Sequence, residues 1–183
     1  MRQVLFYFAI TGWTLGLIVH LLAIADYNAT EKVPFIWLLH ISVFIVWLPA
    51  VLILTKNEEL KAFRQSGSFR QLNPIVASKI FFGQTPIWLK TIAIAGFFYA
   101  IINGVLFMVI SELGTPDIKN GQYILHDHGK LIKTLTEQEY YNYKTNEVRF
   151  FSGHWLLFYG LAAAVLFPYH KQTKKAATNR TFD

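Results

Sequence analysis

The chain has 183 residues, of which 54% are hydrophobic and only 15% are charged, whereas about a quarter of the residues in a soluble domain are usually charged, so the composition indicates a membrane protein. It has no cysteine, which excludes disulfides, thiolate metal sites, thiol catalysis and covalent haem attachment through cysteine. The formal net charge is +6, but most basic residues flank apolar segments, so we expect contact with the lipid bilayer and not with nucleic acid.

Four apolar segments each approach the roughly 20 residues that a helix needs to cross about 30 Å of hydrocarbon. Backbone polar groups in lipid must be hydrogen-bonded within the segment, which predicts helices, and the alternating pattern of a membrane β-barrel is absent. We therefore predict a single, all-α integral membrane domain over residues 1–183, built as a four-transmembrane-helix bundle. The predicted spans are residues 4–25, 34–55, 86–111 and 150–167.

Lysine and arginine are distributed unequally between the segments that connect these spans. The loop at residues 56–85 and the tail after residue 167 are rich in both, whereas the first connection contains only Lys32. The long connection at residues 113–149 has as many acidic residues as basic ones. The positive-inside rule therefore predicts a cytoplasmic loop at 56–85 and cytoplasmic N- and C-termini, an N-in/C-in orientation. We expect the protein in a bacterial inner (plasma) membrane.

Residues 113–149 are predicted to form an extracytoplasmic appendage that contains a small β-hairpin and the start of a helix. Residues 114–117 have the composition of a turn. Two β-prone runs, residues 123–126 and 130–135, follow and are separated by residues 127–129. A glycine in a three-residue connection is typical of a hairpin with a bulge.

A helix start is predicted directly after this hairpin. Thr136 and Glu139 have the spacing of a capping box, and Leu135 and Tyr140 are placed as a hydrophobic staple. We therefore expect a helix that begins at Glu137 and runs directly into the fourth span.

Three histidines lie at a similar depth within the predicted bundle. His20, His40 and His154 are each about four to six residues from the outer end of a span, which places them roughly 6–9 Å below the outer boundary. Glu112 lies slightly shallower, at the end of the third span. Imidazole and carboxylate groups bind transition metals, and imidazole binds haem iron. The candidate ligands of haem or a divalent transition metal are His20, His40, His154 and Glu112, with His126 and His128 on the outer loop as accessory candidates.

Glycines at four- and eight-residue spacing predict helix packing in two spans. Gly12 and Gly16 share a helical face with His20, which indicates that His20 points into the bundle. Gly96 and Gly104 form a similar small-residue ridge in the third span.

Three interpretations of the histidines remain open: structural hydrogen bonds, a metal or haem site, and a proton or quinone site. No sequence motif indicates nucleotide hydrolysis, or serine or zinc-dependent proteolysis. The sequence therefore favours a non-catalytic accessory protein or subunit of a membrane complex, which would contact other membrane proteins through residues 113–149. The alternative is a metal- or haem-binding membrane redox protein that uses the outer histidines.

Overall fold

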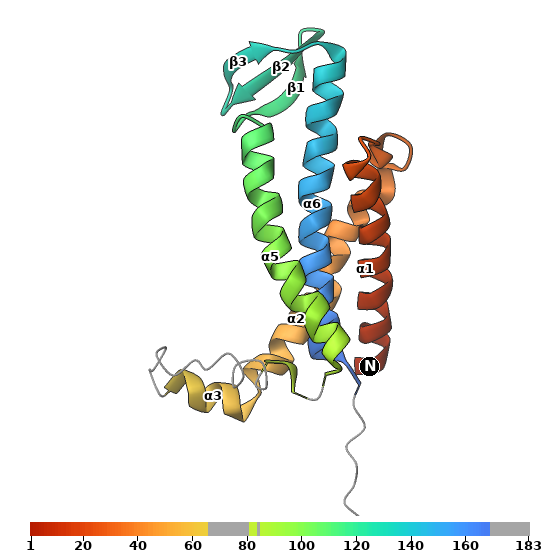
Figure 1. The fold of residues 1–183 in the computed structure, drawn as a ribbon, viewed down its shortest axis with the longest axis vertical. Coiled ribbons are helices and arrows are strands. Elements are labelled where there is room, and N and C mark those ends of the chain that lie inside the picture. Colours follow the sequence, from red (N-terminus) through yellow and green to blue (C-terminus); the bar gives the residue numbers. More distant parts are fainter. Residues whose placement is uncertain (66–80, 84, 169–183) are drawn as a thin grey trace, which may run out of the picture.

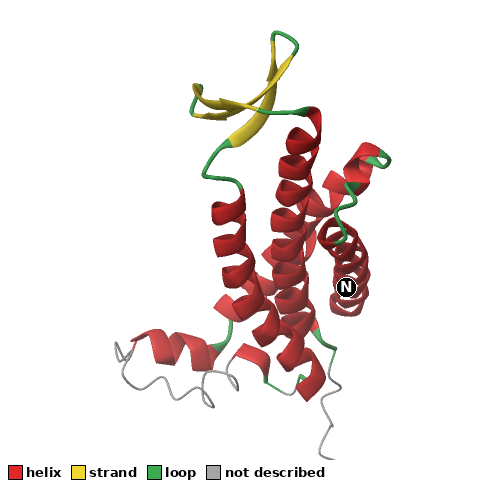
Figure 2. Ribbon diagram, turned by 45° about the horizontal axis from the view of Figure 1, so that its top comes forward, coloured by secondary structure: helices red, strands yellow, loops and turns green. Residues whose placement is uncertain are grey.

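Four long helices make up most of the chain. The computed structural model describes residues 1–65, 81–83 and 85–168 (Figures 1 and 2). Four helical segments are long and apolar enough to cross a membrane, which confirms the predicted number of candidate spans. They are α1 (Arg2–Ile24), η2 with α2 (Pro34–Trp37 and Leu38–Thr55), α5 (Ile87–Ile110) and α6 (Glu137–Leu166).

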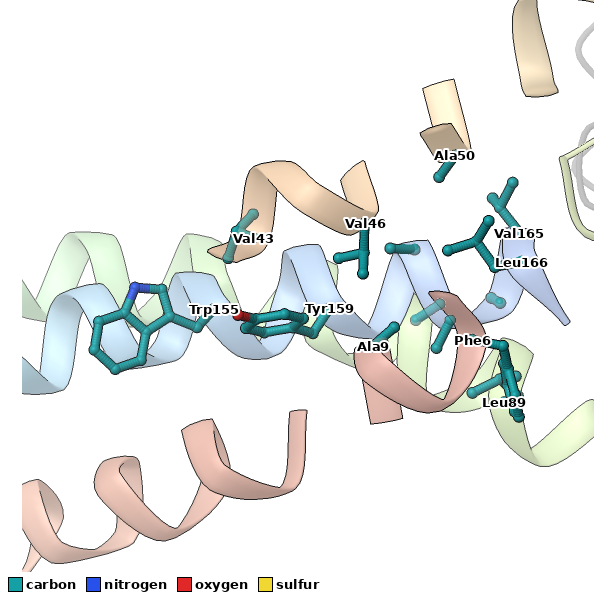
Figure 3. Close-up of a cluster of buried hydrophobic side chains, with 14 of the residues drawn as sticks. Phe6, Ala9, Val43, Val46, Ala50, Leu89, Trp155, Tyr159, Val165 and Leu166 are labelled. Atoms are coloured by element: carbon teal, nitrogen blue, oxygen red, sulfur yellow. The ribbon is translucent and has the colours of Figure 1, made fainter. Parts of the chain in front are cut away.

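Helix α6 lies at the centre of the bundle, and the other three long helices pack around it. It contacts α1 most extensively, then α5 and α2, and most of residues 148–166 are buried. Helices α2 and α5 leave most of their apolar side chains exposed, which is typical of helices that face lipid. The apolar core follows α6 and includes Phe6, Val46, Leu89 and Tyr159 (Figure 3).

Small residues allow the other helices to approach α6 closely. A Cβ atom added at Gly12 of α1 would overlap the ring of Tyr159, and one added at Gly96 of α5 would lie 3.6 Å from Cα of Leu157. In lipid, such close van der Waals packing takes the place of the hydrophobic driving force that holds helices together in water.

Hydrogen bonds join α1 to α6 at the end of the bundle that contains Met1. The Arg2 guanidinium donates hydrogen bonds to the backbone carbonyls of Val165, at 2.8 Å, and Leu166, at 3.3 Å. Carbonyls in the last turn of a helix have no partner within the helix, so the cation satisfies them and offsets the negative end of the helix dipole. The start of α1 and the end of α6 therefore lie at the same end of the bundle (Figure 1).

A three-stranded antiparallel sheet lies beyond the other end, next to the ends of α5 and α6 (Figure 2); in order of pairing its strands are β1 (Thr115–Lys119), β2 (Gln122–Asp127) and β3 (Lys130–Thr134). The two connections are Asn120-Gly121 and His128-Gly129, and all four residues have φ between 47° and 86°. Positive φ at both central residues is the requirement of a type I′ turn, which asparagine and glycine meet most readily.

Two details of the predicted hairpin are wrong. Residues 114–117 are not simply a turn, because residues 115–119 form β1, which pairs with β2 along its whole length. Pro116 is tolerated there because β1 is an edge strand, where an N–H can be missing without breaking the ladder. The connection between β2 and β3 has two residues rather than the three at 127–129, and the bulge lies further along the hairpin, where Ile132 of β3 is the extra residue opposite the step from Leu125 to His126.

The capping box at the start of α6 is confirmed. The Thr136 hydroxyl accepts a hydrogen bond from the backbone N–H of Glu139 at 3.2 Å, and the Glu139 carboxylate accepts one from the backbone N–H of Thr136 at 2.7 Å. Leu135 and Tyr140 belong to one small apolar cluster beneath the sheet. Helix α6 continues from this cap through the predicted fourth span without a break.

An ionic contact ties the sheet to the helices. Lys133 of β3 donates to the Glu112 carboxylate at 2.6 Å, and the Tyr143 hydroxyl of α6 donates to the same oxygen at 2.7 Å. The hydrogen bonds from Lys133 and Tyr143 hold the pKa of the Glu112 carboxyl below its usual value. Glu112 and the following Leu113 have positive φ, which turns the chain sharply from α5 into β1.

Two short elements complete the described part of the chain. The 3₁₀ turn η1 (Ala29–Glu31) lies between α1 and α2, and α3 (Glu58–Gln65) follows α2. The remainder of the predicted loop at 56–85 falls largely on residues 66–80 and 84, outside the described residues.

Candidate functional site

His20 is buried between α1, α5 and α6, at the end of the bundle nearer the sheet. Its Nδ1 lies 2.9 Å from the Ser152 hydroxyl, and its Nε2 is hydrogen-bonded to the Tyr99 hydroxyl. The Ser152 hydroxyl donates its one proton to the backbone carbonyls one turn earlier, of Val148 at 2.7 Å and Arg149 at 3.1 Å. A neutral His20 therefore donates from Nδ1 to Ser152 and accepts at Nε2 from Tyr99, which uses both ring nitrogens.

His40 and His154 make separate hydrogen bonds. His40, on an exposed part of α2, accepts at Nδ1 from the indole N–H of Trp155 at 3.0 Å, so its other ring nitrogen has the proton when the ring is neutral. His154 lies on α6 and donates from Nδ1 to the Phe150 carbonyl at 2.9 Å. Of the three neutral rings, only that of His154 keeps a lone pair that no hydrogen bond within the described residues uses.

The three histidines contact three different faces of α6. His20 contacts Ser152, and His40 packs against Phe151 and Trp155. The His154 ring packs against Phe150, one turn earlier on its own helix, with the two rings tilted relative to each other. Successive residues of a helix are about 100° apart, so residues 150 and 154, residues 151 and 155, and residue 152 form three separate rows. The structure thus brings the histidines to a similar level along α6, but each against a different side of that helix.

The other three candidate ligands, Glu112, His126 and His128, each interact with other groups outside the bundle. Glu112 binds Lys133 and Tyr143 outside the bundle. His126 accepts from the Gly129 backbone N–H, and His128 lies beside Asp127 in an exposed turn. Within the described residues, no group of three or more His, Asp or Glu side chains could hold a metal ion.

A metal or haem site therefore stays a prediction, and a spectrum tests it. A Soret band or stoichiometric bound metal in the purified protein would support the site. A colourless, metal-free and stable preparation would contradict it.

The packing glycines occupy different surroundings. Gly12 and Gly16 face α6, where a Cβ added at Gly16 would lie 3.6 Å from the Trp155 Cβ, and Gly96 faces the α6 backbone. Gly104 has space around it, since an added Cβ would find its nearest atom at 4.0 Å, on Phe150. Among these four glycines, Gly12 has the closest packing, Gly16 and Gly96 make ordinary contacts with α6, and Gly104 has the most space.

A buried asparagine fixes the backbone of α6 beside His20. Asn103 of α5 donates from Nδ2 to the carbonyls of Phe150, at 3.1 Å, and Arg149, at 3.3 Å. It fits because position 153 is glycine: a Cβ there would overlap the Asn103 amide and lie 3.4 Å from the His20 ring. Glycine at 153 therefore allows α1, α5 and α6 to bring their polar groups together.

A polar pocket of about 380 Å³ lies beside this cluster, toward the sheet. It is lined by the end of α1 and the turn after it, the end of α5 and the first half of α6; its lining residues are Ala23, Asp26, Ile110, Gln138, Asn142, Thr145, Asn146 and Arg149. The Asn146 side chain is buried, and neither its Oδ1 nor its Nδ2 has a hydrogen-bond partner among the described residues. The same holds for Nε and Nη2 of Arg149. Each unpaired buried polar group costs about 1–3 kcal/mol. Among the described residues, four of the five buried side-chain atoms without a partner belong to residues that line this pocket.

Sequence reasoning missed this pocket. In the sequence, Arg149 is one of the basic residues of the connection at 113–149, and Asn146 and Ser152 are not among the predicted site residues. The available signal was a polar row at helical spacing within the predicted helix: Gln138, Asn142, Thr145, Arg149 and Ser152 follow one another at intervals of four, three, four and three residues.

Comparison with known proteins gives no relative: no protein-family model matches the chain, and no curated protein or solved structure is significantly similar to it. The structural class of the protein is therefore described from its fold. It is a helical protein with four candidate membrane spans, of which three pack around the fourth, α6, and with a three-stranded sheet at one end.

Proposed function

We propose that the protein is a non-catalytic accessory protein or subunit of a complex in a bacterial inner membrane, with both termini cytoplasmic and the sheet extracytoplasmic. The observation that carries this proposal is the sheet itself. It lies outside the candidate spans, is fixed to two helices, and exposes apolar side chains to its surroundings.

The exposed apolar side chains lie on the two edge strands. Ile118 of β1 is 52% exposed, and Leu131 and Ile132 of β3 are 56% and 42% exposed. Inside a bilayer such exposure is ordinary, but outside the spans each side chain gains about 25 cal/mol for every Å² of apolar surface that a partner covers. A partner's extramembrane domain therefore has a physical reason to bind here.

Contact through side chains is favoured over addition of a further strand. Pro116 in β1 has no N–H to offer an incoming strand, and lysines at 119, 130 and 133 flank the edges, as in edge strands that resist pairing. The hydrogen bonds from Lys133 and Tyr143 to the Glu112 carboxylate hold the sheet in one position. A preorganised surface loses little conformational freedom on binding, which favours a specific partner.

Site-specific photo-crosslinking in native membranes tests this proposal. A photoreactive amino acid at Ile118 or Leu131 is expected to crosslink one discrete protein, and one at Lys32, in the other connection at this end, is the control. The variant Ile118→Lys with Leu131→Lys is expected to reduce recovery of that protein in mild detergent about tenfold or more, since it places charge in an apolar contact. Crosslinks to lipid alone, or a lone monodisperse protein unaffected by the double substitution, would contradict it.

A further inference from the structure

We infer that the polar pocket between α1, α5 and α6 is a binding site for a small carboxylate, held by Arg149 and Asn146. The inference is independent of the proposed partner contact, because the pocket and the exposed side chains of the sheet share no residue.

The Arg149 guanidinium offers two donors to such a ligand. Nε and Nη2 form the side edge of an arginine, which holds a carboxylate through two parallel N–H···O bonds. In Arg149 these two nitrogens are buried, and no acceptor within the described residues meets them. The acidic side chain among the pocket's lining residues is Asp26, and the structure shows no ion pair between it and Arg149 among the described residues. A carboxylate that enters the pocket provides the missing acceptor.

Asn146 is the second, independent observation. It lies three residues before Arg149 on the same helix, is 6% exposed, and has an amide donor and a carbonyl acceptor that are both unpaired among the described residues. The neighbouring Thr145 hydroxyl already donates to the Tyr141 carbonyl at 2.9 Å, so it offers a ligand only its acceptor lone pair. The amide of Asn146 is therefore available to a second oxygen of the ligand, or to a hydroxyl or amine beside the carboxylate.

The surroundings hold these groups in position. Asn103 binds the carbonyls of Arg149 and Phe150, and Ser152, one turn on, binds His20. The backbone that presents Arg149 is thus fixed by hydrogen bonds from Asn103 of α5, and α1 is joined to the same part of α6 through the side chains of His20 and Ser152. Preorganisation of this kind increases affinity because less freedom is lost on binding.

The volume of the pocket and the charge of Asp26 at its rim limit the class of ligand that fits. The pocket volume of about 380 Å³ lies at the lower end of the range for small-molecule sites, roughly 300–1,000 Å³. Asp26 lies on the exposed rim, which disfavours a second negative charge at the mouth and suits a hydroxyl or ammonium group there. The site accordingly fits a short aliphatic monocarboxylate, including a hydroxy acid or an amino acid.

Thermal unfolding of the purified full-length protein in detergent tests the inference. The probes are acetate, butyrate, lactate, L-alanine and succinate, each compared with chloride at the same ionic strength and with the matching primary amide. At least one monocarboxylate is expected to raise the unfolding midpoint, while its amide and chloride do not. Arg149→Gln is expected to weaken the apparent affinity about 30-fold or more, as loss of one partner of a buried charged pair does.

Two further variants keep the test decisive if Arg149→Gln folds poorly. Asn146→Leu removes a side chain whose polar atoms are unpaired without ligand, so it is expected to fold at least as well as the parent protein and to lose the carboxylate response. Lys144→Gln removes a cation from the same helix outside the pocket and is expected to keep the response. The inference is overturned if no probe shifts the midpoint, if amide and carboxylate act alike, or if Asn146→Leu responds as the parent does.

Discussion

The His20 imidazole joins three helices through one pair of hydrogen bonds, with Ser152 on one side and Tyr99 on the other. A buried ring nitrogen that loses its partner keeps the full cost of its desolvation, about 1–3 kcal/mol. His20 is therefore as much a determinant of helix packing as a candidate ligand.

The substitution Ser152→Ala should show this cost. It leaves the His20 Nδ1–H without its partner, so we expect a loss of about 1–3 kcal/mol in the free energy of unfolding, measured by denaturant titration in detergent. Thr14→Ala is the control, since the exposed Thr14 hydroxyl bonds only to the Ile10 carbonyl of its own helix among the described residues. Equal effects of the two substitutions would show that the contact between His20 and Ser152 does not stabilise the fold.

The contact between Glu112 and Lys133 should make attachment of the sheet depend on pH. Its hydrogen bonds lower the pKa of Glu112 below 4.5, so its contribution is complete above that pH and is lost as pH falls through the lowered pKa. The pKa of Lys133 is raised above 10.5 by the same contact, so that contribution is lost only at strongly alkaline pH.

Hydrogen exchange of the β3 amides measures this dependence. Exchange in the parent relative to Glu112→Gln at the same pH should be slower at neutral pH, and the difference should vanish at acidic pH. Comparison at equal pH cancels the intrinsic effect of pH on exchange. A difference that persists unchanged well below the pKa of a free carboxyl would contradict the assignment.

At the scale of elements, close packing of α1 on α6 gives the sharpest test. Gly12→Ala places a methyl group into the Tyr159 ring and is expected to destabilise the protein by about 1–3 kcal/mol. Gly104→Ala, also within a helix, meets only an atom at 4.0 Å and is expected to be neutral or to stabilise by roughly 0.5–1 kcal/mol. Both are read from the same denaturant titration, and a reversed order would show that α1 does not pack on α6 through Gly12.

The long helices could be predicted from the sequence because their signals are local. Apolar length marks the spans, and the capping box at Thr136 and Glu139 marks the first residue of α6. Strand β1 could not be predicted from the sequence, because Gly114 and Pro116 have the local composition of a turn. Residues 115–119 become a strand only by pairing with β2. The Asn120-Gly121 dipeptide was the signal for that hairpin, since it favours a type I′ turn.

The common level of the three histidines along the bundle could be predicted from the sequence, but the rotation of their helices could not. Counting residues from the span ends places His20, His40 and His154 in one layer. Which face each one meets depends on how α1 and α2 rotate against α6, and this is decided by distant contacts such as that of Gly12 with Tyr159. The unpaired groups of Arg149 and Asn146 likewise become visible only when three helices are placed together.

At the scale of the whole molecule, the two ends of the bundle carry different elements and different exposed groups. One end holds Met1, the Arg2 contact with the end of α6, and α3 (Figure 1). The other holds the sheet with its exposed apolar side chains and the mouth of the polar pocket. The proposed function requires this second end to face away from the cytoplasm, where a partner's outer domain is met.

The orientation can be measured directly because the chain has no cysteine of its own. Single-cysteine variants Lys130→Cys in the sheet and Thr178→Cys in the tail would be treated with a membrane-impermeant maleimide, in intact cells and after permeabilisation. The proposed orientation predicts labelling of residue 130 in intact cells and of residue 178 only after permeabilisation. Labelling of residue 178 in intact cells, with residue 130 protected until the membrane is opened, would contradict it.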